Sequence, residues 1–302
     1  MNLRGRVMND IRIDALLPQE MATKAEYLGV QKAEMPFLKM FMLAVLAGAF
    51  ISLGAVFSTT VGAGSMTMNI PGGDVMYTAS LPYGLNRLIV GLVFSLGLIL
   101  VVVGGAELFT GNNLIVMAWA SGKIKGSAVL RNWGIVYLGN FVGSIGTVLL
   151  MFFTRQYTFG ANSVGINALK IGVAKVEFTF IQAVALGILC NGLVCLAVWL
   201  TFSARSTTDK ILAVIFPITA FVAAGFEHSI ANMYFIPYAL FIKFLDPMFT
   251  AAIGDHVTNL GSLTWQSFLF NNLIPVTIGN IIGGAVLVAA IYWAIYLRSG
   301  RR

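Results

Sequence analysis

Six long apolar stretches constrain the fold of this chain more than any other feature of its sequence. They cover roughly 36–59, 84–120, 132–154, 178–203, 210–243 and 272–297. About 20 apolar residues in a row are enough to cross a bilayer as a helix. Only 10% of the residues are charged, whereas a soluble domain carries about 25%. We therefore predict an all-α membrane protein with six transmembrane helices.

Lysine and arginine are distributed unevenly among the segments that flank these stretches. With the N-terminus inside, 14 of them fall in inner segments and 5 in outer segments, which together make the 19 of the chain. Positive residues favour the cytoplasmic side, so both termini are predicted to be cytoplasmic. We divide the chain into an N-terminal segment (1–35), a membrane domain (36–298) and a tail (299–302). A short amphipathic helix at 18–35, beginning with Pro18, is predicted to lie at the inner surface as an anchor or a gate.

The two halves of the chain echo each other. The third and sixth stretches share a motif, at Gly139-Asn140 with Gly143 and at Gly279-Asn280 with Gly283. The second and fifth are too long for one straight crossing, and each carries polar residues at its middle, at 107–112 and 225–232. Three spans per half insert the halves with opposite orientation, and inverted repeats with broken helices place the transport path at the break. We predict an inverted 3+3 repeat, with the second and fifth helices broken, that transports a small anion.

His228 and Thr110 are the predicted centre of that path. The chain has two histidines, and the other, His256, falls in a predicted outer loop. An ionisable side chain at membrane depth indicates a functional site, and histidine titrates near neutral pH. Thr110 lies in the matching break, where its hydroxyl can donate to an anion or hold the imidazole. The alternative for Thr110 is a bond to the carbonyl one turn earlier in its helix.

Glu107 and Glu227 occupy similar places in the two breaks. A broken helix leaves N–H groups without partners, so we predict that each carboxylate accepts several of them and stabilises its loop. Asn140, Asn191 and Asn280 are predicted to cap or cross-link helices in the same way. For Asn191 and Asn280 the alternative is a position facing the path.

Other candidate residues are apolar. Phe94, Leu98, Phe109 and Phe221 flank the polar breaks, either as ordinary core or as hydrophobic constrictions that set size selectivity. The two cysteines, Cys190 and Cys195, are predicted to pack without a disulfide. The sequence lacks motifs for nucleotide hydrolysis, nucleophilic catalysis or metal binding, and its basic residues are not clustered on a soluble module. We expect no enzymatic activity, no cofactor, no metal site and no nucleic-acid partner.

Four sequence runs carry a resemblance to a known family. They are Phe94-Ser95-Leu96-Gly97-Leu98, Ala106-Glu107-Leu108-Phe109-Thr110, Gly225-Phe226-Glu227-His228-Ser229-Ile230-Ala231-Asn232 and Asn272-Leu273-Ile274-Pro275-Val276-Thr277-Ile278-Gly279-Asn280. In these runs the chain resembles the formate/nitrite transporter family, and most closely its bacterial formate channels. The resemblance extends over roughly 15–298. It implies an aquaporin-like protomer in a homopentamer in the bacterial inner membrane, each protomer with its own pore.

The resemblance also implies roles for individual residues. It places Thr110 and His228 on the two loops that break the helices. It assigns an inner constriction to Phe94, Leu98, Phe221 and Ala231, an outer constriction to Phe109 and Val194, polar pore positions to Asn191 and Asn280, and an anion-attracting position near the outer vestibule to Lys175.

The resulting functional hypothesis is a pH-responsive transmembrane channel for formate. A bare carboxylate pays a large desolvation penalty at apolar rings, so His228 is expected to stabilise the anion or to hand it a proton. A nitrite or hydrosulfide channel on the same scaffold is the alternative, since all three are small monovalent weak-acid anions. A neutral-solute facilitator would carry paired Asn-Pro-Ala motifs, which are absent. A non-transporting membrane subunit is the remaining alternative.

Overall fold

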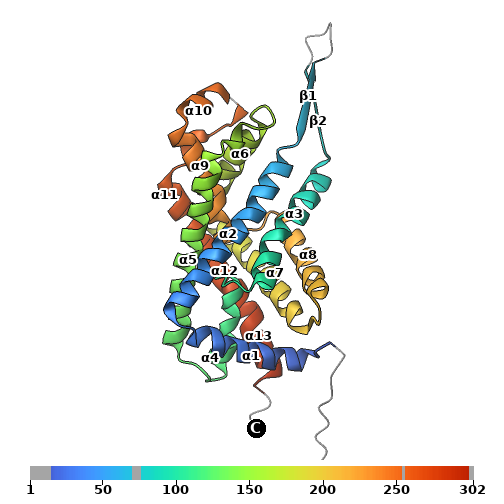
Figure 1. Cartoon of the computed structure of the whole chain (residues 1–302), viewed down its shortest axis with the longest axis vertical. Helices are drawn as coiled ribbons and strands as arrows, with labels where there is room; N and C mark the ends of the chain where they lie inside the picture. The colour runs from blue at the N-terminus through green and yellow to red at the C-terminus, as the bar shows by residue number, and fades with distance from the viewer. Residues whose placement is uncertain (1–14, 70–75, 254–255, 299–302) are drawn as a thin grey trace, which may run out of the picture.

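Five long apolar helices run along the molecule in the computed structural model, which describes residues 15–69, 76–253 and 256–298 (Figure 1). They are α2 (Phe37–Gly62), α3 (Tyr83–Gly104), α5 (Gly126–Phe153), α7 (Phe180–Ser203) and the continuous helical segment Trp265–Tyr296. The last comprises α11 (Trp265–Ser267), η5 (Phe268–Leu273), α12 (Ile274–Ile281), η6 (Ile282–Ala290) and α13 (Ile291–Tyr296). Each is long and apolar enough to cross a membrane, and the bent pair α9–α10 counts as a sixth candidate. The predicted all-helical membrane class is confirmed.

Glycines bring the long helices into close contact at two crossings. On α5, a Cβ added to Gly143 would lie 1.9 Å from the carbonyl oxygen of Val45 on α2. On η6, a Cβ added to Gly283 would lie 2.2 Å from the carbonyl oxygen of Ile188 on α7. Both glycines belong to the motif repeated in the two halves. Small residues of this kind let membrane helices approach backbone to backbone.

Two helices end in the middle of the bundle. α3 ends at Gly104 and is followed by a turn at Gly105, by η1 (Gly111–Ile115) and by α4 (Val116–Ala120). α8 (Thr207–Ala223) is followed by a turn at Gly225 and then by α9 (Ser229–Leu245). The turn glycines have φ values of 78° and 77°, in the left-handed region that costs glycine least. These two loops lie where the sequence carries its polar interruptions.

A β-hairpin marks the upper end of the molecule in Figure 1. It pairs β1 (Ser65–Asn69) with β2 (Met76–Ser80) in antiparallel register, Ser65 opposite Ser80. The elements η2 (Gln156–Thr158), α6 (Ser163–Val176), α10 (Pro247–Ile253) and η4 (Leu260–Ser262) connect the long helices. The sequence analysis predicted neither the hairpin nor α6, because both lie in segments treated as connecting loops.

α1 (Pro18–Glu34) lies across the lower end of the bundle (Figure 1). The predicted helix at 18–35 is therefore present. Its buried face is formed by Met21, Ala22, Ala25, Gly29 and Ala33. Gly29 lies against α4, where an added Cβ would come within 2.9 Å of the Cβ of Ala118. This helix packs on protein, and its predicted position at the inner membrane surface stays a prediction. The segments 1–14 and 299–302 lie outside the described residues.

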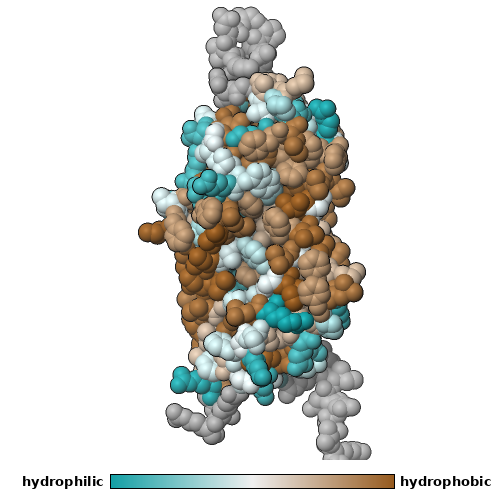
Figure 2. Space-filling view, turned by 90° about the vertical axis from the view of Figure 1, so that its left-hand side faces the viewer, coloured by the Kyte–Doolittle hydropathy of each residue, from teal (hydrophilic) through white to brown (hydrophobic). Residues whose placement is uncertain are grey.

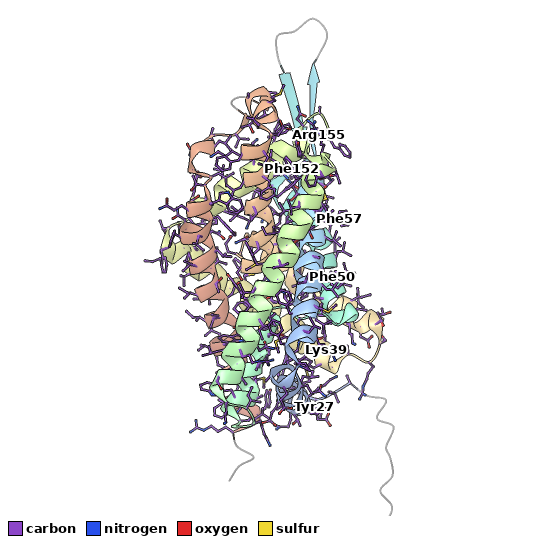
Figure 3. All side chains as sticks on the ribbon, turned by 60° about the vertical axis from the view of Figure 1, so that its left-hand side comes forward. Tyr27, Lys39, Phe50, Phe57, Phe152 and Arg155 are labelled. Carbon is purple, nitrogen blue, oxygen red and sulfur yellow. The ribbon has the colours of Figure 1, made fainter. Side chains whose placement is uncertain are left out.

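The outside of the bundle is apolar over much of its length. Figure 2 shows hydrophobic side chains across the middle of one face and hydrophilic side chains near its two ends. In Figure 3, Phe50, Phe57 and Phe152 lie between Lys39 and Arg155, which mark the lower and upper limits of this band. A contiguous apolar surface of this size requires lipid or partner chains around it.

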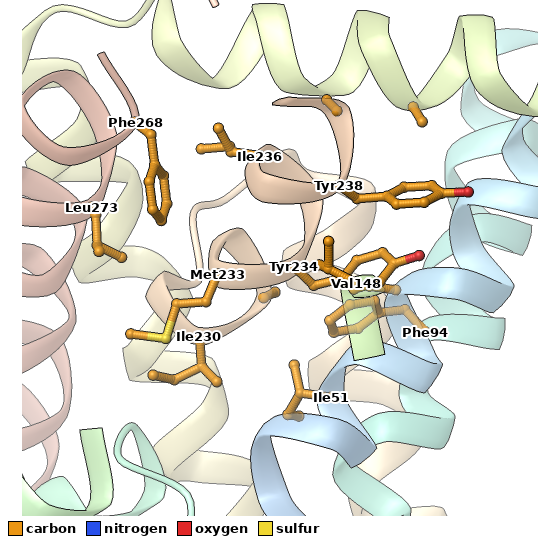
Figure 4. Close-up of a cluster of buried hydrophobic side chains, with 14 of the residues drawn as sticks. Ile51, Phe94, Val148, Ile230, Met233, Tyr234, Ile236, Tyr238, Phe268 and Leu273 are labelled. Carbon is orange, nitrogen blue, oxygen red and sulfur yellow. The ribbon is translucent and has the colours of Figure 1, made fainter. Parts of the chain in front are cut away.

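The interior is filled by large side chains from α9 and its neighbours. Tyr234 and Tyr238 stack with ring centroids 5.3 Å apart, and both are fully buried. Figure 4 shows their rings one above the other, with Phe94 of α3 and then Ile51 of α2 below them. This packing fixes α9 against α2 and α3, and it therefore fixes the position of the loop that precedes α9.

Candidate functional site

The two break loops meet at Thr110 and His228. Thr110 immediately precedes η1 and His228 immediately precedes α9. Thr110 Oγ1 and His228 Nε2 are 3.0 Å apart, although the residues are 118 positions apart in sequence. Both side chains are buried. The structure thus brings together the two residues that the sequence analysis placed at the centre of the path.

The hydrogen bond to the second ring nitrogen of His228, Nδ1, shows which tautomer the ring adopts. The backbone N–H of Ala231 donates to Nδ1 at 3.0 Å, so His228 acts as the N-cap of α9. A nitrogen that accepts a hydrogen bond carries no proton, and neutral imidazole then carries its hydrogen on Nε2. His228 Nε2–H therefore donates to Thr110 Oγ1. The hydroxyl hydrogen of Thr110 is left to donate to a third group.

A clamp of polar side chains holds the first break. Glu107 accepts from Lys32 Nζ of α1 at 2.6 Å and from Asn112 Nδ2 at 2.7 Å. Asn112 Nδ2 also donates to Asn132 Oδ1, and Asn132 Nδ2 donates to the carbonyl of Lys32. Because Glu107 is buried, this pairing removes the cost of an isolated charge in the interior.

An equivalent clamp holds the second break. Glu227 accepts from Lys175 Nζ of α6 at 2.7 Å and from Asn232 Nδ2 at 2.7 Å. Asn232 Nδ2 also donates to Asn272 Oδ1, and Asn272 Nδ2 donates to the carbonyl of Lys175. These four bonds join the same residue types in the same order as in the first clamp, and each clamp has one further bond, from Lys32 to Asn112 in the first and from Asn272 to Glu227 in the second. Lys175, predicted near an outer vestibule, is thus the partner of Glu227.

The asparagines of the repeated motif hold the backbone of the two loops. Asn140 Oδ1 accepts from the N–H of Phe109 at 3.0 Å, and its Nδ2 donates to the carbonyl of Glu107. Asn280 does the same with the N–H of Ser229 and the carbonyl of Glu227. The sequence analysis gave the loop N–H groups to the glutamates. The structure gives them to the asparagines, because the carboxylates turn toward the lysines instead.

Asn191 and the two cysteines are buried beside this centre. Asn191 Nδ2 donates to the carbonyl of Asn280 at 2.6 Å, which is the cross-linking arrangement of the two alternatives. Cys195 Sγ lies 3.3 Å from the carbonyl of Thr110. Both cysteines are free thiols, as predicted.

A cavity of about 400 Å³ opens on the hairpin side of the Thr110–His228 pair. We call it the hairpin-side cavity. The rings of Phe94 and Phe221 meet edge to face in its wall at 5.8 Å, and Phe221 stacks on His228 at 5.9 Å. Two cations, Arg87 and Lys175, also line it. A wall that combines aromatic rings with two cations suits a site that draws in an anion and then strips its water.

Arg87 holds the end of α8 in this cavity. Its guanidinium donates to the carbonyls of Val222 and Ala223. These are among the last carbonyls of α8, where the helix carries its partial negative charge. Arg87 therefore neutralises a helix end that would otherwise repel an anion in the cavity.

A second cavity of about 380 Å³ lies on the side of α1, and we call it the α1-side cavity. Leu98, Leu108 and Val198 form its apolar wall. Its charged lining residues are Lys24, Lys32, Lys210 and Glu107. The buried Thr110–His228 pair thus lies between two cavities, each lined by cations.

The predicted constriction residues divide between these spaces. Phe94, Phe221 and Ala231 line the hairpin-side cavity, and Leu98 lines the α1-side cavity. Phe109 lies in neither of them. It packs edge to face on Tyr137 at 4.9 Å and lines an apolar groove on the side of the bundle. Val194 is buried and lines neither cavity, so its pairing with Phe109 in a constriction stays a prediction.

The comparisons with known proteins follow this geometry. The model of the formate/nitrite transporter family matches residues 19–294. The chain belongs to the formate/nitrite transporter family. It is 48% identical over 290 residues to the formate channel FocA of Escherichia coli strain K12, covering 96% of this chain and 97% of that one. It is 41% identical to the formate channel FocA of Haemophilus influenzae, covering 91% and 92%.

Solved structures agree with this assignment. A pentameric formate channel with formate bound is 47% identical and superposes with a TM-score of 0.76, covering 87% of this chain and 98% of that one. An ion channel of the same family superposes with a TM-score of 0.72 at 25% identity. The predicted resemblance is confirmed, and the family consists of transporters and channels rather than enzymes.

Sequence analysis missed several polar residues in this family member. They are Lys32, Asn112, Asn132, Asn232 and Asn272 of the clamps, and Arg87 of the hairpin-side cavity. The internal repeat carried a signal for four of them. Asn112 and Asn232 follow the break glutamates by five residues, and Asn132 and Asn272 precede the motif asparagines by eight. No equivalent spacing marks Arg87. Within the described parts of the chain, no cluster of His, Cys, Asp and Glu side chains forms a metal site.

Proposed function

We propose that this protein is a pH-responsive transmembrane channel for formate and similar small weak-acid anions. The observation that carries the proposal is the buried Thr110–His228 hydrogen bond between two cation-lined cavities. Relatives named formate channels, similar over nearly their whole length, support formate as the substrate.

The topology of the proposal is an aquaporin-like protomer of six spans in an inverted 3+3 repeat. α3 with η1–α4 forms the broken second span, and α8 with α9 forms the broken fifth. The matching clamps at Glu107 and Glu227 support this pairing, because in each half one lysine and one asparagine donate to the glutamate. With both termini cytoplasmic, the α1-side cavity opens to the cytoplasm and the hairpin-side cavity opens outward. The proposed setting is a homopentamer in the bacterial inner membrane.

Entry of the anion depends on the two cations of the hairpin-side cavity. Lys175 forms an ion pair with Glu227, and Arg87 covers the negative end of α8. The anion then reaches the rings of Phe94 and Phe221, where its hydration shell must be removed. Desolvating a full charge there costs far more than desolvating the neutral acid. Transfer of a proton to the anion at this point lowers the barrier.

His228 and Thr110 supply the polar groups at that point. In the neutral form His228 donates to Thr110, which orients the threonine hydroxyl to donate to the anion. Protonating His228 places a hydrogen on Nδ1, where the Ala231 N–H now donates. A charged His228 must therefore release its cap on α9. Proton transfer and a shift of the first turn of α9 are coupled in this mechanism.

The apolar lining sets size selectivity in this scheme. Phe94, Phe221 and Ala231 act on the outer side of the pair, and Leu98 acts on the inner side. Narrow apolar rings admit a small neutral acid and exclude hydrated cations. Asn280 and Asn140 hold the loops in place, and Asn191 holds Asn280.

Flux measurements in proteoliposomes test the proposal. The panel is formate, nitrite, acetate and hydrosulfide at one pH above and one pH below the ordinary histidine pKa of about 6.5. We expect formate flux to be high and to depend on pH. The variant His228→Asn should flatten this dependence, because asparagine does not titrate in this range.

The control for this test is Lys39→Gln, which removes an exposed charge outside both cavities. Faster flux of nitrite or hydrosulfide than of formate would favour the alternative substrates. A His228→Asn variant that keeps the full pH dependence of formate flux would contradict the proton-transfer role.

A further inference from the structure

The α1-side cavity is lined by more lysines than carboxylates, three against one. Of its three lysines, Lys32 is matched by Glu107 at 2.6 Å. Among the described residues, neither Lys24 nor Lys210 has a carboxylate within ion-pairing distance. Two carboxylates close to them in the sequence accept hydrogen bonds from backbone N–H groups. Glu20 accepts from the N–H of Leu17, and Asp209 accepts from the N–H groups of the turn before α8.

Lys24 reaches this cavity from α1. Its Nζ donates to the carbonyl of Phe202 at 2.9 Å, near the end of α7. An ammonium has three N–H donors, so this bond leaves two of them for another acceptor. Lys210 reaches the same cavity from the first turns of α8. Helices distant in the sequence thus present two ammonium groups to one space.

The two lysines lie close enough to repel each other. Burial lowers the pKa of Lys24 below its usual range, and the positive charges of Lys210 and Arg205 lower it further. Mutual repulsion of this kind is relieved when an anion lies between the charges.

The space is suited to a small anion. Its volume is about 380 Å³, and Leu98, Leu108 and Val198 are among its apolar lining residues. We propose that Lys24 and Lys210 form a binding site for a small carboxylate or oxyanion in the α1-side cavity. This inference rests on the proposed function for its substrate, formate, and on the proposed topology for its side, the cytoplasm.

The site concentrates the anion at the inner mouth of the path. Two positive charges in a recess raise the local concentration of a monovalent anion without changing the equilibrium across the membrane. The consequence is a lower half-saturation concentration for formate that enters from the cytoplasm. The maximal flux and the half-saturation concentration from the outside are unaffected.

Charge-preserving and charge-removing variants separate this role from a structural one. Lys24→Gln keeps a donor for the carbonyl of Phe202 and loses the charge, whereas Lys24→Arg keeps the charge. A binding site predicts that the Arg variant resembles the wild type, and a mere helix contact predicts that the Gln variant does. Lys210→Gln and Lys210→Arg make the same comparison, with Lys39→Gln as the control outside the cavity.

The experiment measures formate flux in oriented proteoliposomes as a function of formate concentration on the α1 side. The double variant Lys24→Gln/Lys210→Gln should raise the half-saturation concentration about three- to tenfold at low salt. The difference should shrink near 1 M salt, where the Debye length falls to about 3 Å. An unchanged half-saturation concentration in the double variant, with wild-type formate flux intact, overturns the inference alone.

A second measurement does not depend on transport. An amine-reactive reagent labels lysines in the detergent-solubilised protein, and peptide mass spectrometry follows Lys24 and Lys39. Formate should slow labelling of Lys24 but not of Lys39, relative to the same ionic strength of a bulky organic anion. Absence of this protection overturns the site. If the wild-type protein shows no formate flux, the proposed function is overturned instead. The labelling experiment still tests the site in that case, because it measures protection of Lys24 without transport.

Discussion

His228 combines two roles that are separable at the level of single atoms. Its Nε2 contacts Thr110, and its Nδ1 caps α9 through the N–H of Ala231. Asparagine is a good N-cap and phenylalanine is not. The residue therefore contributes to the stability of α9 independently of any proton transfer.

Two substitutions at this position test the capping role. We expect His228→Phe to lower the free energy of unfolding by about 1 kcal/mol relative to His228→Asn, because only asparagine can accept the N–H of Ala231. Thermal unfolding of the detergent-solubilised variants measures the difference. Equal melting temperatures would show that the Nδ1 contact contributes no stability. Both variants lose the titratable ring, so flux alone does not separate them.

Each of the two clamps is built from common polar residues that the fold brings together. Each glutamate is held by one lysine and one asparagine, and the lysines come from α1 and α6, outside the broken helices. The break was predicted from the polar residues inside an apolar stretch. The pairing of each glutamate with a lysine was not predicted, since Lys32 and Lys175 lie 75 and 52 positions from their partners.

At the scale of elements, the crossings of α2 with α5 and of α7 with η6 depend on missing side chains. Gly143 faces the backbone of α2, whereas Gly146 of the same helix faces open space in the chain as described. Of these two positions, only Gly143 has no room for a methyl group.

This pair of glycines makes a matched test within one helix. Gly143→Ala should lower the free energy of unfolding by about 1–3 kcal/mol, because the methyl group must push α2 away. Gly146→Ala should be neutral or slightly stabilising, since alanine favours the helix by up to about 1 kcal/mol over glycine. Thermal unfolding in detergent compares the two. Equal losses at both positions would mean that the close approach at Gly143 is not tight.

The β-hairpin and α6 are two elements that the sequence analysis did not predict. Both lie between apolar stretches, and the search for 20-residue windows does not register short elements at the ends of a bundle. α6 matters to the site because it carries Lys175. The N-terminal helix was predicted within one residue of its observed end, because Pro18 and the polar-apolar pattern mark it locally.

At the scale of the whole molecule, the apolar exterior requires a surrounding. Large side chains such as Phe216, Leu150 and Leu138 are 76%, 70% and 62% exposed in the single chain. An apolar groove that includes Tyr137, Thr277 and Ile278 runs along one side of it. Lipid tails cover such a surface in part, and neighbouring protomers cover the rest in the proposed pentamer.

The assembly is tested by its mass. Native mass spectrometry of the protein released from detergent micelles should give five times the 32.5 kDa of one chain. Chemical cross-linking in native membranes provides the control for detergent effects. A mass of one or two chains in both measurements would contradict the pentamer.

The sequence by itself determined the membrane class and the family, and it predicted the two polar loops and the residues Thr110 and His228 that meet there. These predictions rest on local or periodic features: the length of the apolar stretches, the repeated Gly-Asn motif and one histidine inside an apolar stretch. Such features can be recognised without knowing which residues are in contact. Only the tertiary structure decided what each polar group binds. It showed which nitrogen of His228 carries the hydrogen and which lysine pairs with which glutamate. It also showed that Asn140 and Asn280 bind the backbone of the two loops. It also moved Phe109 to a lateral groove and brought Lys24 beside Lys210. Periodicity fixes which face of a helix is apolar, but the rotation and depth of each helix are set by packing among segments far apart in the chain.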